Sequence, residues 1–272
     1  MSKLASLIFF IAVSVGPILS FAQDTAITSH QVYGYKDGMA MYYDVEAPLE
    51  RNGRGIILIV SGGMVSGEDN LNIVKPFWEV LLQEGYTLFQ IYHPAHPTYR
   101  IPVAYDSLKL GIEHIKRNSL KFGVDRNRLG MFGVSSGGYL ALLLSMSVNP
   151  DERSFSDIDA VVAIMPLVDV ESSEFDVTLF GANIKDFDPT LYYSLSPINH
   201  VSADDPPTLL IHGNRDEAVN FEENSIRMKQ LLDAAGVENQ LLEVDAGHET
   251  FLEPHMTEAH EAIIDRYADH LF

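Results

Sequence analysis

A short glycine-containing turn between two apolar segments most constrains how this chain can fold. The run Gly133-Val134-Ser135-Ser136-Gly137 matches the pattern Gly-x-Ser-x-Gly. It follows a short apolar strand pattern at 128–133 and precedes 138–146, a helix pattern that is apolar on every side. A tight turn between a buried strand and a buried helix exposes the hydroxyl of its central serine. Ser135 is therefore a candidate nucleophile.

The rest of the chain alternates strand patterns with helix patterns. Segments 31–35 and 39–45 flank Lys36-Asp37-Gly38 and predict an antiparallel hairpin. Further strands are predicted at 55–60, 86–92, 158–165, 208–212 and 240–244, and helices at 72–84, within 103–122, at 221–235 and at the C-terminal end. Gly85 and Gly236 are expected to end two of these helices. The alternation predicts one α/β domain, with a mostly parallel central sheet and helices on both faces.

One segment interrupts this alternation. Residues 167–205 are polar, aromatic and proline-containing, and they lie between two predicted strands. Insertions of this length in a compact domain are usually functional or carry small elements of their own. We expect a lid or cap beside the candidate site, with a plain surface insertion as the alternative.

The first 22 residues have the pattern of a secretory signal peptide. Lys3 supplies positive charge, residues 7–15 form an apolar run, and Ser20-Phe21-Ala22 offers small residues for cleavage. A membrane anchor is the alternative, but the apolar run is short and is followed by Gly16-Pro17. We expect cleavage after Ala22, a single domain at 23–272, and a secreted or periplasmic location without membrane attachment.

Charge and cysteine content exclude several classes of function. The formal net charge of −20 argues against nucleic acid or anionic membrane surfaces as partners. The chain contains no cysteine, which excludes disulfides, a cysteine nucleophile and thiolate metal sites.

A serine nucleophile needs a base to take its proton and an acid to orient that base, and both candidates follow Ser135 in the chain. Asp216 lies just after the predicted strand at 208–212, and His248 follows the strand that ends near Val244. Because ligands gather at the carboxyl ends of parallel strands, we expect both side chains to lie at one edge of the sheet. Asp169 also follows a strand and remains an alternative acid, whereas Asp245 is too close to His248 in sequence to orient it.

The other histidines have less support as the base. His212 is expected to be a structural turn residue, and His255 lies near the start of the last helix. His93 and His96 could suggest a metal pair, but the two prolines among them and the lack of a carboxylate partner favour a structural or groove-lining role. We expect no metal and no cofactor.

The anion formed during acyl transfer needs backbone N–H donors. Ser136, one residue after the candidate nucleophile, is expected to supply one donor. The turn Ser61-Gly62-Gly63-Met64 follows the first parallel strand, and Gly63 and Met64 are the candidates for the second. An ordinary glycine turn is the alternative reading of this segment.

With these residues in place, the chain resembles the α/β-hydrolase superfamily over roughly residues 30–272. It looks most like the esterase branch near carbohydrate esterases and prolyl-oligopeptidase-type catalytic domains. The matching segments are 133–138, 212–219, 247–248 and 196–198. In this branch the turn after the first parallel strand is often His-Gly-Gly, whereas here Ser61 stands in the histidine position.

The resemblance implies a secreted serine hydrolase that cleaves carboxylic esters through an acyl-enzyme intermediate. By family analogy alone, the substrate would be a small-molecule or carbohydrate-linked ester, such as an acetylated or feruloylated polysaccharide. A serine exopeptidase and a non-catalytic binding protein on the same scaffold remain alternatives. The segment before Ser135 is short for the N-terminal domain that usually restricts access to such peptidases.

Overall fold

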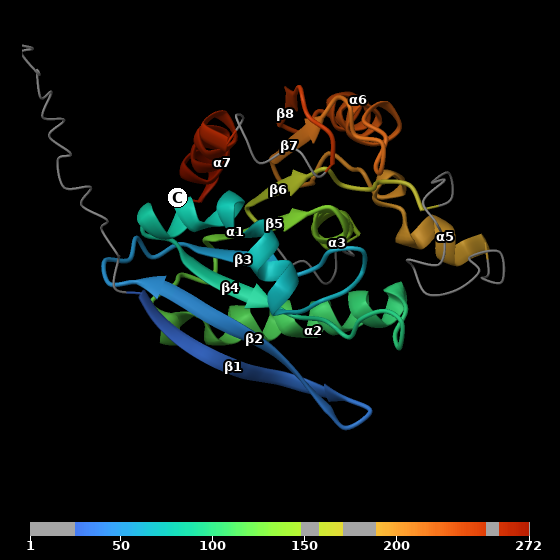
Figure 1. Cartoon of the computed structure of the whole chain (residues 1–272). Coiled ribbons are helices and arrows are strands. Elements are labelled where there is room, and N and C mark those ends of the chain that lie inside the picture. Colours follow the sequence, from blue (N-terminus) through green and yellow to red (C-terminus); the bar gives the residue numbers. More distant parts are fainter. Residues whose placement is uncertain (1–24, 148–157, 171–188, 249–255, 272) are drawn as a thin grey trace, which may run out of the picture.

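The computed structural model describes residues 25–147, 158–170, 189–248 and 256–271, and its centre is an eight-stranded sheet (Figure 1). The strand order is β1-β2-β4-β3-β5-β6-β7-β8. The strands are β1 (Thr25–Lys36), β2 (Met39–Pro48), β3 (Gly55–Ile59), β4 (Thr87–Ile91), β5 (Leu129–Val134), β6 (Ala160–Ile164), β7 (Thr208–Gly213) and β8 (Asn239–Val244). β1 pairs with β2, and β2 with β4, in antiparallel fashion, whereas every pair from β4 through β8 is parallel. The predicted fold class, including its N-terminal hairpin, is confirmed.

Helices cover both faces of this sheet. The α-helices are α1 (Glu68–Gln83), α2 (Ile101–Asn118), α3 (Ser136–Met146), α5 (Pro189–Leu195), α6 (Arg227–Ala235) and α7 (Met256–His270). α1 and α7 pack on one face, and α2, α3 and α6 pack on the other (Figure 1). Two apolar cores result, one on each side of the sheet.

The sequence of β3 explains why both faces are covered. Successive side chains of a strand point to opposite faces. Ile57 and Ile59 join the core beneath α2 and α3, whereas Ile56 and Leu58 join the core beneath α1 and α7. A continuous apolar strand can bury all of its side chains only between two helical layers.

Glycines end two of the helices as predicted. Gly85 and Gly236 adopt positive φ angles of 86° and 76°. The Gly85 N–H donates to Leu82 O, and the N–H of the next residue reaches Leu81 O, which satisfies the last carbonyls of α1. The helix predicted at 221–235 differs from its prediction: a π-helical turn over Glu222–Ile226 precedes α6. Asn220 Oδ1 accepts the N–H of Glu223, three residues further on, which is one half of a capping box.

Two predicted features lie partly or wholly outside the described residues. The signal peptide at 1–22 lies outside them, as does 171–188 of the predicted lid. The described part of this segment contains α5 and a 3-10 turn at Pro197–Asn199, and it is attached to the domain where Tyr139 Oη donates to Leu195 O at 2.8 Å. Among the described helices, none has the length and apolar character needed to cross a membrane.

Candidate active site

Ser135 lies in a strained turn between β5 and α3. Its φ of 53° is positive, a conformation that non-glycine residues adopt rarely and usually at functional sites. Glycines make the turn possible: a Cβ on Gly133 would lie 2.2 Å from Gly137 O, and one on Gly137 would lie 2.8 Å from Ile59 O. Gly133 and Gly137 are therefore required in the Gly-x-Ser-x-Gly pattern, because at each of them another part of the backbone lies too close for a side chain.

The loops after β7 and β8 lie against each other at the same edge of the sheet. Backbone hydrogen bonds join Asn214 N to Val244 O and Arg215 N to Ala246 O, at 2.9 and 3.0 Å. A Cβ on Gly213 would lie 2.3 Å from Ala246 O, so this close approach also requires glycine. The loop that carries Asp216 is thereby fixed beside the loop that carries His248.

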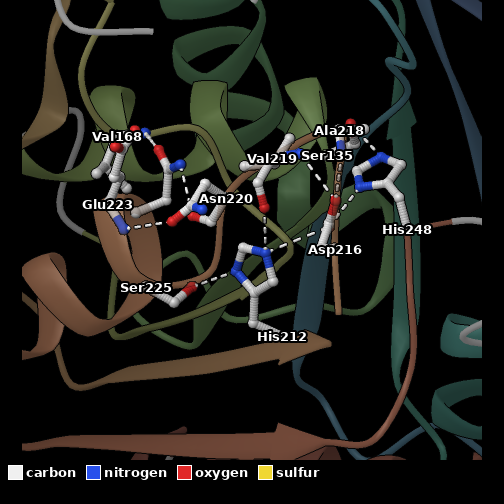
Figure 2. A network of polar contacts seen from close by, with 11 residues as sticks. Ser135, Val168, His212, Asp216, Ala218, Val219, Asn220, Glu223, Ser225 and His248 are labelled. Carbon is white, nitrogen blue, oxygen red and sulfur yellow. Dashed lines mark hydrogen bonds and ion pairs between the residues drawn. The ribbon is translucent and has the colours of Figure 1, made fainter. Parts of the chain in front are cut away.

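The structure brings the three predicted side chains together. His248 Nε2 is 3.1 Å from Ser135 Oγ, and His248 Nδ1 is 2.6 Å from Asp216 Oδ2 (Figure 2). A carboxylate only accepts hydrogen bonds, so Nδ1 carries the hydrogen and neutral His248 can accept the serine proton at Nε2. These contacts join positions 113 and 32 residues apart in sequence.

Asp216 is a buried carboxylate surrounded by donors. Its Oδ1 accepts the N–H groups of Ala218 and Val219 at 2.9 and 2.7 Å. Its Oδ2 is contacted by both His248 and, at 3.2 Å, His212 Nε2 (Figure 2). Burial alone would raise the pKa of this carboxyl group, but the hydrogen bonds from His212, His248 and Val219 outweigh burial and hold the pKa well below its usual value. Asp216 is therefore ionised beside the imidazole.

His212 is a structural residue with more contacts than the sequence indicated. Its Nε2 lies 2.9 Å from Val219 O as well as near Asp216, so this nitrogen carries the hydrogen. Its Nδ1 is 2.6 Å from Ser225 Oγ, in the π-helical turn. The ring is fully buried and supports Asp216 on the side away from His248 (Figure 2).

The alternative acids are engaged elsewhere. Asp169 forms an ion pair with Arg227 Nη1 at 2.6 Å and lies near the Ser196 hydroxyl. Asp245 is exposed and pairs with Arg215 Nε at 2.8 Å. Neither is the carboxylate in contact with His248. The alternative base His255 lies outside the described residues.

The three backbone N–H groups predicted to bind the anion differ in whether they already have a hydrogen-bond partner. Ser136 is the first residue of α3, so its N–H has no partner within the helix. Gly63 lines the cavity beside Ser135, and its N–H has no partner within the described part of the chain. The N–H of Met64 donates instead to Ser136 Oγ at 3.1 Å. Because this N–H is already engaged, the expectation that Met64 is a donor is corrected.

The side chain of Ser135 faces a cavity of about 390 Å³. It is lined by Ser61, Gly62, Gly63, Asn70, Ile73, Val74, Phe77, Val134, Ser135, Met165 and His248. The wall contributed by α1 was not expected from the sequence. Its residues Asn70, Ile73, Val74 and Phe77 recur at three- and four-residue spacing. That spacing, directly after the glycine turn, is the signal that could have identified this wall.

The sequence offered His93 and His96 as a candidate metal pair. His93 is buried, and its Nδ1 lies 2.9 Å from Pro94 O. Within the described ranges, no group of three or more His, Cys, Asp or Glu side chains is arranged to hold a metal ion.

A serine, an aspartate and a histidine in this chain order, at the carboxyl edge of a sheet of this topology, define an α/β-hydrolase. The BD-FAE profile matches residues 43–232. The chain therefore belongs to the BD-FAE family of α/β-hydrolase esterases.

The individual proteins that this chain resembles share only modest sequence identity with it. Esterase LipC of Mycobacterium tuberculosis is 30% identical over 159 residues, which cover 53% of this chain and 40% of the relative. The chain spans between 40% and 53% of the three curated relatives considered. A truncated carbohydrate esterase from gut microbiota superposes with a TM-score of 0.74 and 22% identity, over 89% of this chain and 96% of the other. An acetyl ester-xyloside bifunctional hydrolase from Caldicellulosiruptor lactoaceticus gives 0.71 and 22%, over 88% and 92%. At this identity the two structures support the fold alone.

Proposed function

We propose that this protein is an exported carboxylic-ester hydrolase that works through a covalent acyl-serine intermediate. The observation that carries the proposal is the His248 ring, which lies 3.1 Å from Ser135 Oγ and 2.6 Å from Asp216 Oδ2. Membership of an esterase family supports ester hydrolysis, and the pattern of residues 1–22 supports export.

The first half of the reaction transfers the acyl group to the enzyme. Ser135 Oγ attacks the ester carbonyl carbon while His248 Nε2 takes the hydroxyl proton. Asp216 stabilises the resulting imidazolium, and the N–H groups of Ser136 and Gly63 stabilise the negative charge on the carbonyl oxygen. The C–O bond to the alcohol then breaks, and His248 returns its proton to the departing oxygen.

The second half releases the acid. Water replaces the alcohol, and His248 Nε2 takes one of its protons as the water oxygen attacks the acyl carbon. The tetrahedral intermediate collapses, the proton returns to Ser135 Oγ, and the carboxylic acid leaves. Each residue is used twice, and no cofactor is needed to balance either half.

Acetyl or feruloyl esters of carbohydrates are the proposed substrate class. Two proteins with the same fold carry carbohydrate-ester names. The mostly apolar cavity beside Ser135 offers room for an acyl group.

The replacement Ser135→Ala tests the mechanism. We expect hydrolysis of p-nitrophenyl acetate to fall by at least about 10³-fold, because the variant retains only binding and anion stabilisation. A fluorophosphonate should label wild-type protein at Ser135 and leave the variant unlabelled. Hydrolysis by folded Ser135→Ala at the wild-type rate would overturn the proposal.

A substrate panel tests the class. Aryl esters of increasing acyl length are compared with acetylated and feruloylated xylan fragments and with chromogenic dipeptide amides. We expect esters to be turned over faster than amides. Faster release of dipeptides would make the exopeptidase reading the better one.

A further inference from the structure

Two buried serine hydroxyls connect the turn after β3 to the start of α3. Ser61 Oγ and Ser136 Oγ are 2.9 Å apart, although 75 positions separate them in sequence. The two residues are 4% and 8% exposed. The N–H of Met64, at the other end of the same turn, donates to Ser136 Oγ at 3.1 Å. Ser136 Oγ thus contacts the turn at two points.

The chemistry of a hydroxyl group explains how Ser136 Oγ can take part in both contacts. A buried hydroxyl that accepts a hydrogen bond still needs an acceptor for its own hydrogen. Ser136 Oγ accepts from Met64, and Ser61 Oγ lies at the right distance to accept from Ser136. Met64 N–H therefore donates to Ser136 Oγ, and the two hydroxyl groups share a second hydrogen bond for which either oxygen can be the donor.

The turn itself is compact. Gly62 and Val65 exchange backbone hydrogen bonds of 2.9 and 3.0 Å, and the two residues between them, Gly63 and Met64, have φ angles of 56° and 60°. Positive φ at both central positions is the conformation of a two-residue hairpin turn. Such a turn is fixed internally, but contacts outside it must set its orientation toward α3. The Ser136 contact acts on the peptide that directly follows Gly63.

We propose that the Ser61–Ser136 hydroxyl pair positions the two donors that bind the developing anion. Ser136 supplies one donor through its own N–H, and its Oγ holds the turn that presents the N–H of Gly63. A fixed separation of two N–H groups matters most in the transition state, when the carbonyl oxygen becomes negatively charged. This inference rests on the proposed ester hydrolysis and adds positioning roles for two side chains.

The replacement Ser136→Ala tests the inference while keeping the Ser136 backbone donor. We expect kcat for p-nitrophenyl acetate to fall about 10- to 30-fold and KM to change less than about twofold, because the lost contact orients a transition-state donor. The inhibition constant of an aryl boronic acid should rise by the same factor as kcat falls, whereas inhibition by the product carboxylate should not change. Ser145→Ala is the matched control, since Ser145 is another buried serine of α3 and its Oγ donates to Leu142 O. It should change neither constant by more than about twofold.

Ser61→Ala provides a second variant outside the helix. We expect a smaller loss in kcat, about 3- to 10-fold, because Ser136 Oγ still accepts from Met64. The double variant should lose little more than Ser136→Ala, since both hydroxyl groups act on one turn. If Ser136→Ala does not fold, Ser61→Ala alone decides.

Two results would overturn the inference: folded Ser136→Ala and Ser61→Ala with unchanged kcat, or equal losses of boronic acid and product affinity. Either result combined with an inactive Ser135→Ala leaves the proposed function intact. Activity retained by Ser135→Ala overturns the proposed function itself.

Discussion

At the scale of single residues, the contacts of a carboxylate distinguish two candidates that their positions in the sequence do not. Both Asp169 and Asp216 follow parallel strands, so the sequence left Asp169 open as an alternative. Asp169 is paired with Arg227, whereas Asp216 receives two backbone N–H groups and contacts two histidines. Ala218, Val219 and His212 lie within four residues of Asp216, but the contacts of Asp216 with His248 and of Asp169 with Arg227 join positions 32 and 58 residues apart, and no local pattern reveals them. Ser135 was predictable because its turn is defined by adjacent residues.

Asp216→Asn is predicted to reduce kcat by about 10³- to 10⁴-fold. The amide can donate a hydrogen bond to His248 Nδ1, which favours the tautomer whose Nε2 cannot accept the serine proton. Steady-state kinetics with an aryl acetate measure the effect. Asp245→Asn is the control, because this carboxylate is exposed and pairs with Arg215, and it should change kcat less than about twofold. A larger loss of kcat in folded Asp169→Asn than in Asp216→Asn would make Asp169 the acid.

At the scale of elements, local sequence patterns predicted whether a segment is a helix or a strand better than they predicted the residues at which it begins and ends. The buried strands and the helix ends at Gly85 and Gly236 were read from adjacent residues. The start of α1 was expected at residue 72 but lies at Glu68, because Gly67 precedes the helix without a side-chain cap to mark it. The π-helical turn before α6 had no sequence signal. This turn places Ser225 Oγ beside His212 Nδ1, so its conformation is set by a tertiary contact and not by the local sequence.

Gly133→Ala is predicted to prevent the turn at Ser135 from forming. The new Cβ would lie 2.2 Å from Gly137 O, and backbone atoms cannot move away as a flexible side chain can. We expect a loss of about 4 kcal/mol or more in the free energy of unfolding, measured by urea denaturation. Gly67→Ala is the matched control, because nothing lies within 4 Å of its added Cβ. Gly133→Ala with wild-type stability would show that the turn can adopt another conformation.

Because α1 forms a wall of the cavity, we predict that this helix sets the acyl preference. Ile73 lines the cavity but is 66% exposed, so its side chain is available to a substrate and contributes little to the core. Ile73→Ala should lower kcat/KM for p-nitrophenyl hexanoate relative to the acetate by about fivefold, through lost apolar contact with the longer chain. Leu110→Ala, on α2 and 52% exposed, should leave the ratio unchanged. An unchanged ratio in Ile73→Ala would mean that the acyl group lies elsewhere.

At the scale of the whole molecule, the alternation of patterns predicted a two-faced parallel sheet but not the order of its strands. β4 lies between β2 and β3, an arrangement that depends on which strand edges meet in three dimensions. The two cores also enclose polar groups whose burial a local pattern cannot reveal. His93 was expected to have a structural or groove-lining role, and it is only 6% exposed.

The burial of His93 links the stability of the domain to pH. Desolvation lowers the pKa of its imidazole from 6.5 to about 4, although the hydrogen bond to Pro94 O partly offsets this effect. Between these two values the unfolded chain binds a proton that the folded chain does not. The contribution of His93 to the free energy of unfolding is therefore fully present above pH 6.5. It falls as the solution is acidified, by about 2 kcal/mol at pH 5. Asp216 acts in the same direction only at lower pH, because its folded pKa is held below the unfolded value.

His93→Asn isolates this contribution, because an asparagine amide can still donate to Pro94 O and does not titrate. Urea unfolding between pH 7.5 and pH 5 should show a wild-type free energy of unfolding that falls more steeply, with a difference between the two curves of about 2 kcal/mol at pH 5 relative to pH 7.5. The variant starts from a lower stability, so the slopes are compared and not the absolute values. Parallel curves for wild type and His93→Asn would mean that burial does not lower the pKa of this imidazole in the folded domain.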